Sequence, residues 1–491
     1  MNSKILAIGV LLPFILMMLL YESTAQTKST GRHLTEKLKP CHVTEVEEEV
    51  LCGHYDVYEN RAARTGRKIS LNIVILPAKT SDVADDPFVF LAGGGVAPAT
   101  GYTSYFAKSF TDIRQHRDIL LIDQRGSGGS NGLDCALSTD PADPDYRDEA
   151  RYVQSVRRCR KELEQKADLR FYSTPIAMDD LDDVREWLGY PRINIYGVSY
   201  GTQAASVYLR QHPKSVRSLV LHGTVPLDLP MWLDYARNSQ QALDQDFAIC
   251  ARQKACHDAF PNVSQEFNAL LKRLEEKPVK IKVQNTETKQ EVEVSIDAEI
   301  LRVFVSRLLY SSERIHDLPL LIHLAYSGNY EPLAQKVVYF QGPGEIPKGV
   351  YFCIVCNEEW HFDPAGLPAA AANTFMGDFR LTRESQACAE WAHSSLPKDY
   401  WTPVKSDLPT LIMNGALDHA TPPRYGERVA QSFTNSRRLV LPNRGHNDTD
   451  PCVAGIVQAF VTAGSSQNLD TSCLAKTEDL SFALRVEDLA N

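Results

Sequence analysis

Short apolar runs that end in glycine or in polar turns recur along the first half of the chain, with amphipathic segments between them. The runs predict strands at 68–78, 87–95, 117–130, 192–197 and 216–223. Helix-period patterns occupy 177–190 and 200–213, and Pro213 ends the second. Strands that alternate with helices form a mostly parallel sheet with helices on both faces, so the pattern predicts an α/β fold.

The alternation stops after the strand predicted to end at residue 223. Residues 226–400 hold helical segments and a polar stretch, KPVKIKVQNTETKQEVEVSID, but no apolar run typical of a parallel strand. The sheet pattern resumes at 408–418 and 436–446. We therefore expect a core in two parts, 40–225 and 401–480, and a largely helical cap, 226–400, inserted between them.

The first 25 residues predict an export signal. Lys4 precedes the apolar run 5–20, and STA at 23–25 offers a small-x-small cleavage site. A retained anchor helix is the alternative, but 16 residues with Pro13 among them are short for a bilayer. We expect residues 1–25 to be removed and the mature chain to be secreted or periplasmic, without stable membrane insertion.

Cysteine usage fits the same compartment. Eleven cysteines in an oxidising space should mostly pair. Spacing favours the disulfides Cys41–Cys52, Cys250–Cys256, Cys135–Cys159 and Cys452–Cys473. A bond between Cys356 and Cys388 would leave Cys353 free. The segment CIVC at 353–356 also has the form of a redox or zinc motif, but no second such pair accompanies it.

Length and charge narrow the class of protein. A chain of 491 residues suits one large α/β domain with an insertion, or two domains. The hydrophobic share of 43% and the charged share of 23% are those of a globular protein. A net charge of −10 argues against nucleic acid as a partner, because phosphate binding needs a basic face.

The pattern Gly-x-Ser-x-Gly occurs twice, in two different contexts. Ser199 lies in INIYGVSYG, between an apolar strand and a helix rich in small residues. This is the context of a nucleophile elbow, a tight turn that holds the serine hydroxyl at the carboxyl edge of a sheet. Ser130 lies in GGSNG, which loop sequence follows. We predict that Ser199 is the nucleophile and that Ser130 is a loop serine.

A serine nucleophile needs a histidine as its base and a carboxylate to orient that histidine. In a sheet of this type the chain order is serine, acid, histidine. Asp418 and His446 follow the last two predicted strands in that order, so we expect both at the edge that holds Ser199. Asp228, after an earlier strand, and His419, beside Asp418, are the alternatives.

Two groups of backbone N–H donors are expected to stabilise the oxyanion. One is the N–H of Tyr200, the residue after the nucleophile. The other comes from the glycine turn after the strand FVFL, through Gly94 or Gly95. A tight turn with no catalytic role is the alternative reading of those glycines.

Together, these motifs resemble those of a known family, the exported α/β-hydrolase peptidases of the tripeptidyl aminopeptidase and proline iminopeptidase type. The resemblance covers about 40–480 through FLAGGG, LLIDQRGSGGS, INIYGVSYGTQAA, PTLIMNGALDHATP and LPNRGHN. It implies an α/β-hydrolase fold in which Ser199, Asp418 and His446 act together. The family pattern G-G-P-G is replaced here by GGGVAPA, which implies a change in substrate preference.

The resemblance also implies a substrate with a free amino end. An acidic pair in CNEEW, Glu358 and Glu359, would hold the ammonium, with Glu358 favoured by the family pattern C-x-E. A solvated acidic pair is the alternative. Trp360 and Phe362 would line an apolar pocket or pack in the core. We expect a serine hydrolase of the aminopeptidase type that needs no cofactor or metal; a carboxylesterase with the same residues is the alternative.

Overall fold

The computed structural model describes residues 31–138, 140, 142–285, 289–340, 347–360, 364–446, 448–477 and 479–489. The predicted export signal, 1–25, and Phe362 lie outside the described residues.

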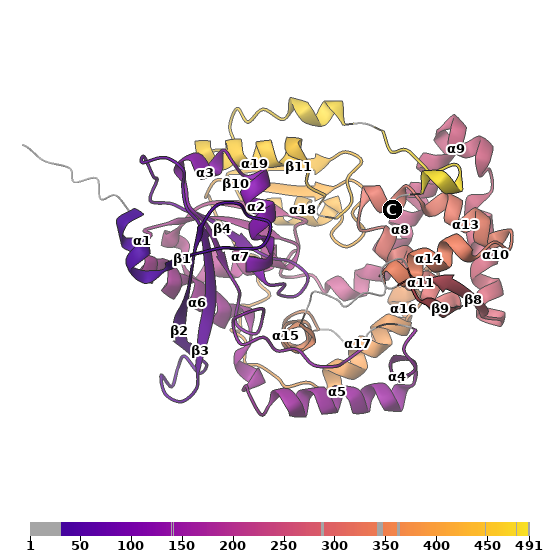
Figure 1. Ribbon diagram of the computed structural model, residues 1–491, viewed down its shortest axis with the longest axis horizontal. Coiled ribbons are helices and arrows are strands. Elements are labelled where there is room, and N and C mark those ends of the chain that lie inside the picture. Colours follow the sequence, from indigo (N-terminus) through magenta and orange to yellow (C-terminus); the bar gives the residue numbers. More distant parts are fainter. Residues whose placement is uncertain are drawn as a thin grey trace, which may run out of the picture.

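A mixed sheet forms the core of the part of the molecule that lies to the left in Figure 1. Its strands are β1 (Lys39–Cys41), β2 (Val50–Tyr58), β3 (Lys68–Leu76), β4 (Phe88–Leu91), β5 (Ile119–Ile122), β6 (Ile193–Val198), β7 (Val216–His222), β10 (Thr410–Gly415) and β11 (Ser436–Leu441). Their spatial order is β1-β2-β3-β5-β4-β6-β7-β10-β11. The pairs from β5 to β11 are parallel, whereas β1, β2 and β3 join antiparallel, so the predicted mostly parallel sheet is confirmed.

Side chains of the central strands serve two hydrophobic cores in alternation, as the twofold period of a strand requires. On β4, Val89 and Leu91 belong to one core, and Phe88 and Phe90 belong to the other. Helices cover both faces, which is why these strands are apolar throughout rather than alternating with polar residues. The first core takes α1 (Gly31–Lys37), α6 (Thr174–Leu188), α7 (Tyr200–Gln211) and α18 (Pro423–Ala430), and the second takes α2 (Thr103–Ser109), α3 (Ile113–His116) and α19 (Pro451–Ala463).

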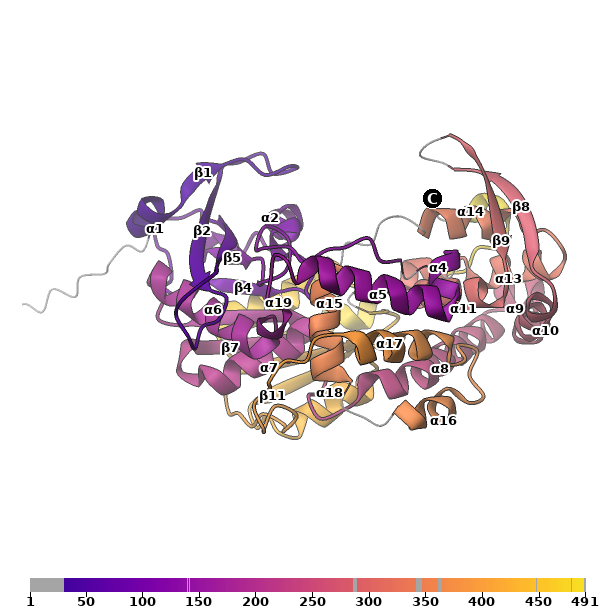
Figure 2. The ribbon, with the colours of Figure 1, turned by 90° about the horizontal axis from the view of Figure 1, so that it is seen from below.

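The chain between β7 and β10 is mostly helical. Its helices are α8 (Met231–Arg252), α9 (Lys254–Ala259), α10 (Val263–Glu276), α11 (Ala298–Leu308), α12 (Ser312–Ile315), α13 (Leu318–Tyr326), α14 (Glu331–Phe340), α15 (Lys348–Ile354), α16 (Leu367–Ala371) and α17 (Phe379–Glu390). An antiparallel hairpin, β8 (Val279–Gln284) and β9 (Glu291–Ile296), stands at its outer end (Figure 2). The hairpin occupies the polar stretch, where the alternation VKIKVQ is the strand signal.

Two other parts of the chain join this helical segment. Before β6, the chain leaves the sheet to form α4 (Pro144–Arg147) and α5 (Glu149–Leu163), and α5 lies alongside α17 (Figure 2). Arg157 on α5 forms an ion pair with Glu390 on α17. The last described segment also returns to these helices, since Gln253, between α8 and α9, donates to the carbonyl of Leu480.

Five disulfides stabilise the described chain, and their pairing confirms the sequence prediction. The bonds are Cys41–Cys52, Cys135–Cys159, Cys250–Cys256, Cys356–Cys388 and Cys452–Cys473. Cys353 is a free, fully buried thiol, and burial raises its pKa to about 12. The thiol therefore stays protonated, and because Cys356 is bonded to Cys388, the two cysteines of CIVC do not pair with each other.

Candidate active site

Ser199 occupies a strained turn between β6 and α7. Its φ of 55° and ψ of −122° lie outside the regions that non-glycine residues normally adopt. The flanking glycines make this turn sterically possible. A Cβ on Gly197 would lie 2.3 Å from the carbonyl oxygen of Gly201, and one on Gly201 would lie 2.0 Å from that of Leu91. The turn has the geometry expected of a nucleophile elbow.

Ser130, the serine of the other Gly-x-Ser-x-Gly pattern, holds two segments of the backbone together. Its side chain is fully buried, and its hydroxyl donates to the carbonyl of Asp123 at 2.6 Å. The same hydroxyl accepts the backbone N–H of Asn72 at 2.8 Å. Both hydrogen-bonding capacities are therefore used to join β3 to the turn after β5.

Asp418 and His446 lie together at the carboxyl edge of the sheet. His446 Nδ1 is 2.9 Å from Asp418 Oδ2, and the carboxylate also accepts from the N–H and hydroxyl of Thr421 at 2.7 and 2.6 Å. Burial alone would raise the pKa of Asp418, but the charge of His446 and these hydrogen bonds hold it below its ordinary value. Asp418 is thus an anion that keeps the proton on Nδ1 and leaves Nε2 as an acceptor.

The alternative residues have other partners. Asp228 forms a bidentate ion pair with Arg428, with contacts of 2.9 and 2.8 Å. His419 is fully buried, between the carbonyl of Leu309 and the hydroxyl of Tyr235. Burial lowers the pKa of His419 to about 3, so this imidazole stays neutral.

The helical segment between β7 and β10 helps to position His446. Its backbone N–H donates to the carbonyl of Tyr310 at 2.8 Å, and the Tyr310 ring meets the imidazole edge-on at 5.5 Å. Gly445 permits this approach, because a Cβ there would lie 2.6 Å from that carbonyl oxygen. The histidine is therefore held from both sides, by Asp418 and by the end of α11.

The glycine turn after β4 approaches Ser199 closely. A Cβ on Gly93 would lie 2.9 Å from the Cβ of Ser199. Gly94 and Gly95 have φ values of 67° and 71°, a region that glycine adopts without cost. Gly94 and Gly95 line the same cavity as Ser199 and Tyr200, the residue at the start of α7.

One cavity of about 880 Å³ brings together Ser199, Tyr200 and His446, whereas Asp418 contacts His446 from outside its lining. Its lining includes Ser199, His446 and the glycine turn. Aromatic side chains form much of the wall, namely Phe90, Tyr102, Tyr105, Tyr196, Trp232, Tyr235, Tyr310 and Tyr351. A space of this size and character suits a small organic molecule or a short peptide.

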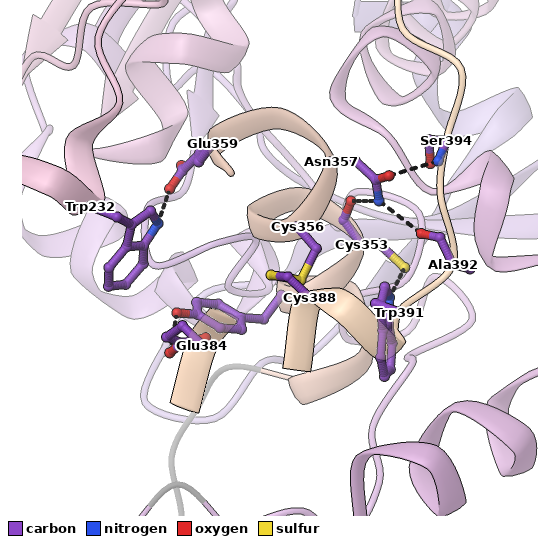
Figure 3. The surroundings of a disulfide bond; sticks show 11 residues. Trp232, Cys353, Cys356, Asn357, Glu359, Glu384, Cys388, Trp391, Ala392 and Ser394 are labelled. Atoms are coloured by element: carbon purple, nitrogen blue, oxygen red, sulfur yellow. Dashed lines mark hydrogen bonds between the residues drawn. A yellow bond between two sulfur atoms is a disulfide. The ribbon is translucent and has the colours of Figure 1, made fainter. Parts of the chain in front are cut away.

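The two adjacent glutamates separate at the cavity wall. Glu359 lines the cavity, and its carboxylate accepts from Trp232 Nε1 at 2.7 Å (Figure 3). Glu358 is directed elsewhere, because its carboxylate accepts from the N–H of Thr174 at 2.6 Å and from the hydroxyl of Tyr400. Burial raises the pKa of each glutamate to about 7. Of the predicted pair, Glu359 is the one in contact with the cavity.

Several residues of the site are absent from the sequence prediction. Thr421 and Tyr310 hold Asp418 and His446, and Trp232 holds Glu359. Thr421 stands three residues after Asp418, a spacing that permits a local side-chain hydrogen bond. Tyr310 and Trp232 carry no such signal, because their contacts depend on tertiary packing.

Within the described ranges, no group of three or more His, Cys, Asp or Glu side chains is placed to hold a metal ion. None of the helices in those ranges has the length and apolarity to cross a bilayer.

Comparison with known proteins identifies the family. A family model described as the alpha/beta hydrolase fold matches residues 86–450, well over half of the chain. The chain belongs to this α/β-hydrolase family. The matched range begins just before β4 and ends after His446, so it contains every element that positions the site.

Curated relatives agree with this assignment. The putative hydrolase YuaR of Escherichia coli K12 is 27% identical over 248 residues, 47% of this chain and 49% of the relative, so the match spans about half of that protein. A tripeptidyl aminopeptidase of Streptomyces coelicolor is 25% identical over 392 residues, 72% of this chain and 70% of the relative. The serine protease Hip1 of Mycobacterium bovis is 26% identical over 42% of each chain. The resemblance to the tripeptidyl aminopeptidase type is thereby confirmed.

Proposed function

We propose that this α/β hydrolase is a serine hydrolase whose nucleophile, base and orienting acid are Ser199, His446 and Asp418. The observation that carries the proposal is the Asp418–His446 pair, which shares a cavity edge with a serine in a strained strand-to-helix turn. Each feature alone has a structural explanation. Their meeting in one cavity supports acyl transfer.

The proposed mechanism follows from these positions. His446 Nε2 takes the proton of Ser199 Oγ as the oxygen attacks the substrate carbonyl, and Asp418 stabilises the imidazolium. The N–H groups of Gly94 or Gly95 and of Tyr200 donate to the oxyanion. His446 then gives its proton to the leaving group, and water releases the acyl group from the serine by the same steps in reverse.

We propose an aminopeptidase-type substrate, a peptide with a free amino end. Glu359 supports this proposal, because its carboxylate lies on the wall of the cavity that contains Ser199. An ammonium beside it would favour the ionised carboxylate, through a charge-assisted hydrogen bond. The relatives named tripeptidyl aminopeptidase and serine protease point to the same class of substrate.

We also propose that the protein is exported and that the helices of 226–400 act as a cap. Five disulfides support export, because such bonds persist in oxidising compartments. The cap assignment rests on the cavity wall, to which α8, α11 and α17 each contribute side chains.

A panel of aminoacyl, prolyl, dipeptidyl and tripeptidyl amides, each with a free and a blocked amino end, tests the substrate class. The proposal expects cleavage of the free forms at a rate at least about tenfold above the blocked forms, because one charge-assisted contact is lost on blocking. Equal rates for both forms would overturn the aminopeptidase assignment. Turnover of blocked esters alone would replace it with a carboxylesterase.

A further inference from the structure

Three arginines line the cavity that contains Ser199, and each comes from a different helix. Arg307 lies on α11, Arg314 on α12 and Arg380 on α17. The acids of the same wall, Glu359 and Asp448, already accept hydrogen bonds from the protein. The cavity wall therefore holds more cationic than anionic side chains.

Arg380 is held by aromatic rings rather than by an acid. Its guanidinium lies 5.1 Å from the ring centre of Trp232 and 4.9 Å from that of Tyr235, and Nη1 donates to the Tyr235 hydroxyl at 3.2 Å. Among the residues that the structure describes, no carboxylate lies within ion-pair distance of Arg380. Glu384, one helical turn farther along, accepts from the Tyr351 hydroxyl, and its charge acts on the pKa of Arg380 from beyond ion-pair distance. A cavity cation without a paired anion is favourably placed to bind one.

Arg307 adds a second positive charge near Arg380. Burial lowers the pKa of Arg307, and the charge of Arg380 acts in the same direction, although Asp140 opposes both. The two guanidinium groups are thus close enough to repel each other, and both stay protonated at neutral pH. An anion between or beside them would relieve that repulsion, and a carboxylate fits the planar fork of arginine.

Trp232 contacts both Glu359 and Arg380 and so fixes how far apart these two side chains lie. Its Nε1 donates to Glu359, and its ring face contacts Arg380. The disulfide Cys356–Cys388 also joins the π-helical turn Val355–Glu359 to α17 (Figure 3). A ligand that spans one indole can therefore place an ammonium at Glu359 and a carboxylate at Arg380.

We propose that Arg380, with Arg307 beside it, binds a carboxylate of the substrate. This inference rests on the proposed function for the peptide nature of that substrate. The carboxylate has two sources in a peptide, an acidic side chain near the amino end or the free carboxyl end of a short chain. Both place a negative charge on the same short peptide as the ammonium.

Matched substrate pairs test the inference and separate the two sources. The first set compares tripeptidyl coumarylamides with Glu or Gln at each position in turn. The second compares short peptides with a free or an amidated carboxyl end. In one set, kcat/KM should be about 10- to 100-fold higher for the member with the carboxylate, the range of a charge-assisted contact. A ratio near one in both sets, with neutral amides still cleaved, would overturn the inference.

Arginine variants show whether the preference comes from this site. Arg380→Gln should bring the ratio close to one, Arg307→Gln should lower it, and Arg380→Lys should keep part of it. Arg170→Gln, which removes an exposed charge of an ion pair with Asp168, should leave the ratio unchanged. Because each ratio is taken within one variant, a general loss of activity does not mimic the effect. A ratio preserved in both Arg380→Gln and Arg307→Gln would contradict the proposal.

A third substrate pair distinguishes failure of this inference from failure of the proposed function. If no amide is cleaved, the aminopeptidase assignment fails. The nitrophenyl monoester of succinate and its methyl-capped form then give the same carboxylate ratio on esters. A preference for the free acid that Arg380→Gln removes would still support the subsite, and equal rates would overturn it.

Discussion

Ser130 and Ser199 share the pattern Gly-x-Ser-x-Gly but occupy opposite kinds of environment. Ser130 follows a strand into a loop, where its hydroxyl is buried and joins Asn72 to Asp123. Ser199 follows a strand into a helix, where the turn is strained and faces the 880 Å³ cavity. The same five-residue pattern therefore indicates chemistry only where a strand, a tight turn and a helix meet.

The largest difference should appear when each serine is replaced by alanine. Ser199→Ala should lower kcat by about 10⁴-fold or more, because the acyl-enzyme cannot form. Steady-state assays on the best substrate of the amide panel measure this. Ser130→Ala is the control and should retain most of the kcat of the folded enzyme. A larger loss of kcat in Ser130→Ala than in Ser199→Ala would contradict the assignment of the two serines.

The acids Asp418 and Asp228 give the next largest difference. Asp418→Asn should lower kcat by about 10³- to 10⁴-fold, because an amide no longer fixes the proton on Nδ1 of His446. Asp228→Asn only breaks an ion pair with Arg428 and should change kcat less than about threefold. A comparable loss in both variants would mean that the orienting acid has been misassigned.

The neighbouring glutamates extend the comparison to substrate binding. Glu359→Gln should lower kcat/KM for free-amino amides by about 10- to 100-fold and leave blocked esters unaffected. Glu358→Gln should cost stability, about 1 kcal/mol, without changing the ratio of free to blocked substrates. A change in that ratio for Glu358→Gln alone would move the ammonium site to the other glutamate.

Glu359 also determines how the ratio of kcat/KM for free-amino over blocked substrates should depend on pH. Burial raises the pKa of Glu359 to about 7, so its carboxylate ionises as the pH rises through 7. The substrate ammonium loses its proton above about pH 8. The ratio should therefore rise through pH 7 and fall again above pH 8, and Glu359→Gln should remove the rising limb.

Ser130 should affect the stability of the fold rather than the rate of the reaction. Its replacement by alanine leaves the N–H of Asn72 and the carbonyl of Asp123 without the hydroxyl that joins them, at a cost of about 1–3 kcal/mol in the free energy of unfolding. Denaturant unfolding measures this loss. An unchanged free energy of unfolding would mean that the buried hydroxyl has no structural role.

Much of the fold could be predicted from the sequence because its signals are local. Buried parallel strands are apolar throughout, and the tight turn at Ser199 needs glycine on both sides. The order of strands also places Asp418 and His446 at one edge. The disulfides follow in the same way, since four of the five join cysteines at most 24 residues apart.

The substrate-binding part of the site could not be predicted in this way. The contacts of Trp232, Arg380 and Glu359 join helices more than a hundred residues apart in the sequence. Which of two adjacent glutamates faces the cavity depends on a single π-helical turn, Val355–Glu359. No periodicity in the sequence specifies that turn.

A fluorophosphonate probe tests whether Ser199 is the nucleophile, because it reacts only with a serine that a base has activated. After labelling and tryptic digestion, Ser199 lies in the peptide 193–210 and Ser130 in the peptide 126–147. We predict a single adduct, on Ser199, that disappears in Ser199→Ala and is strongly slowed in Asp418→Asn. An adduct on Ser130, or a folded protein that takes up no probe, would contradict the account.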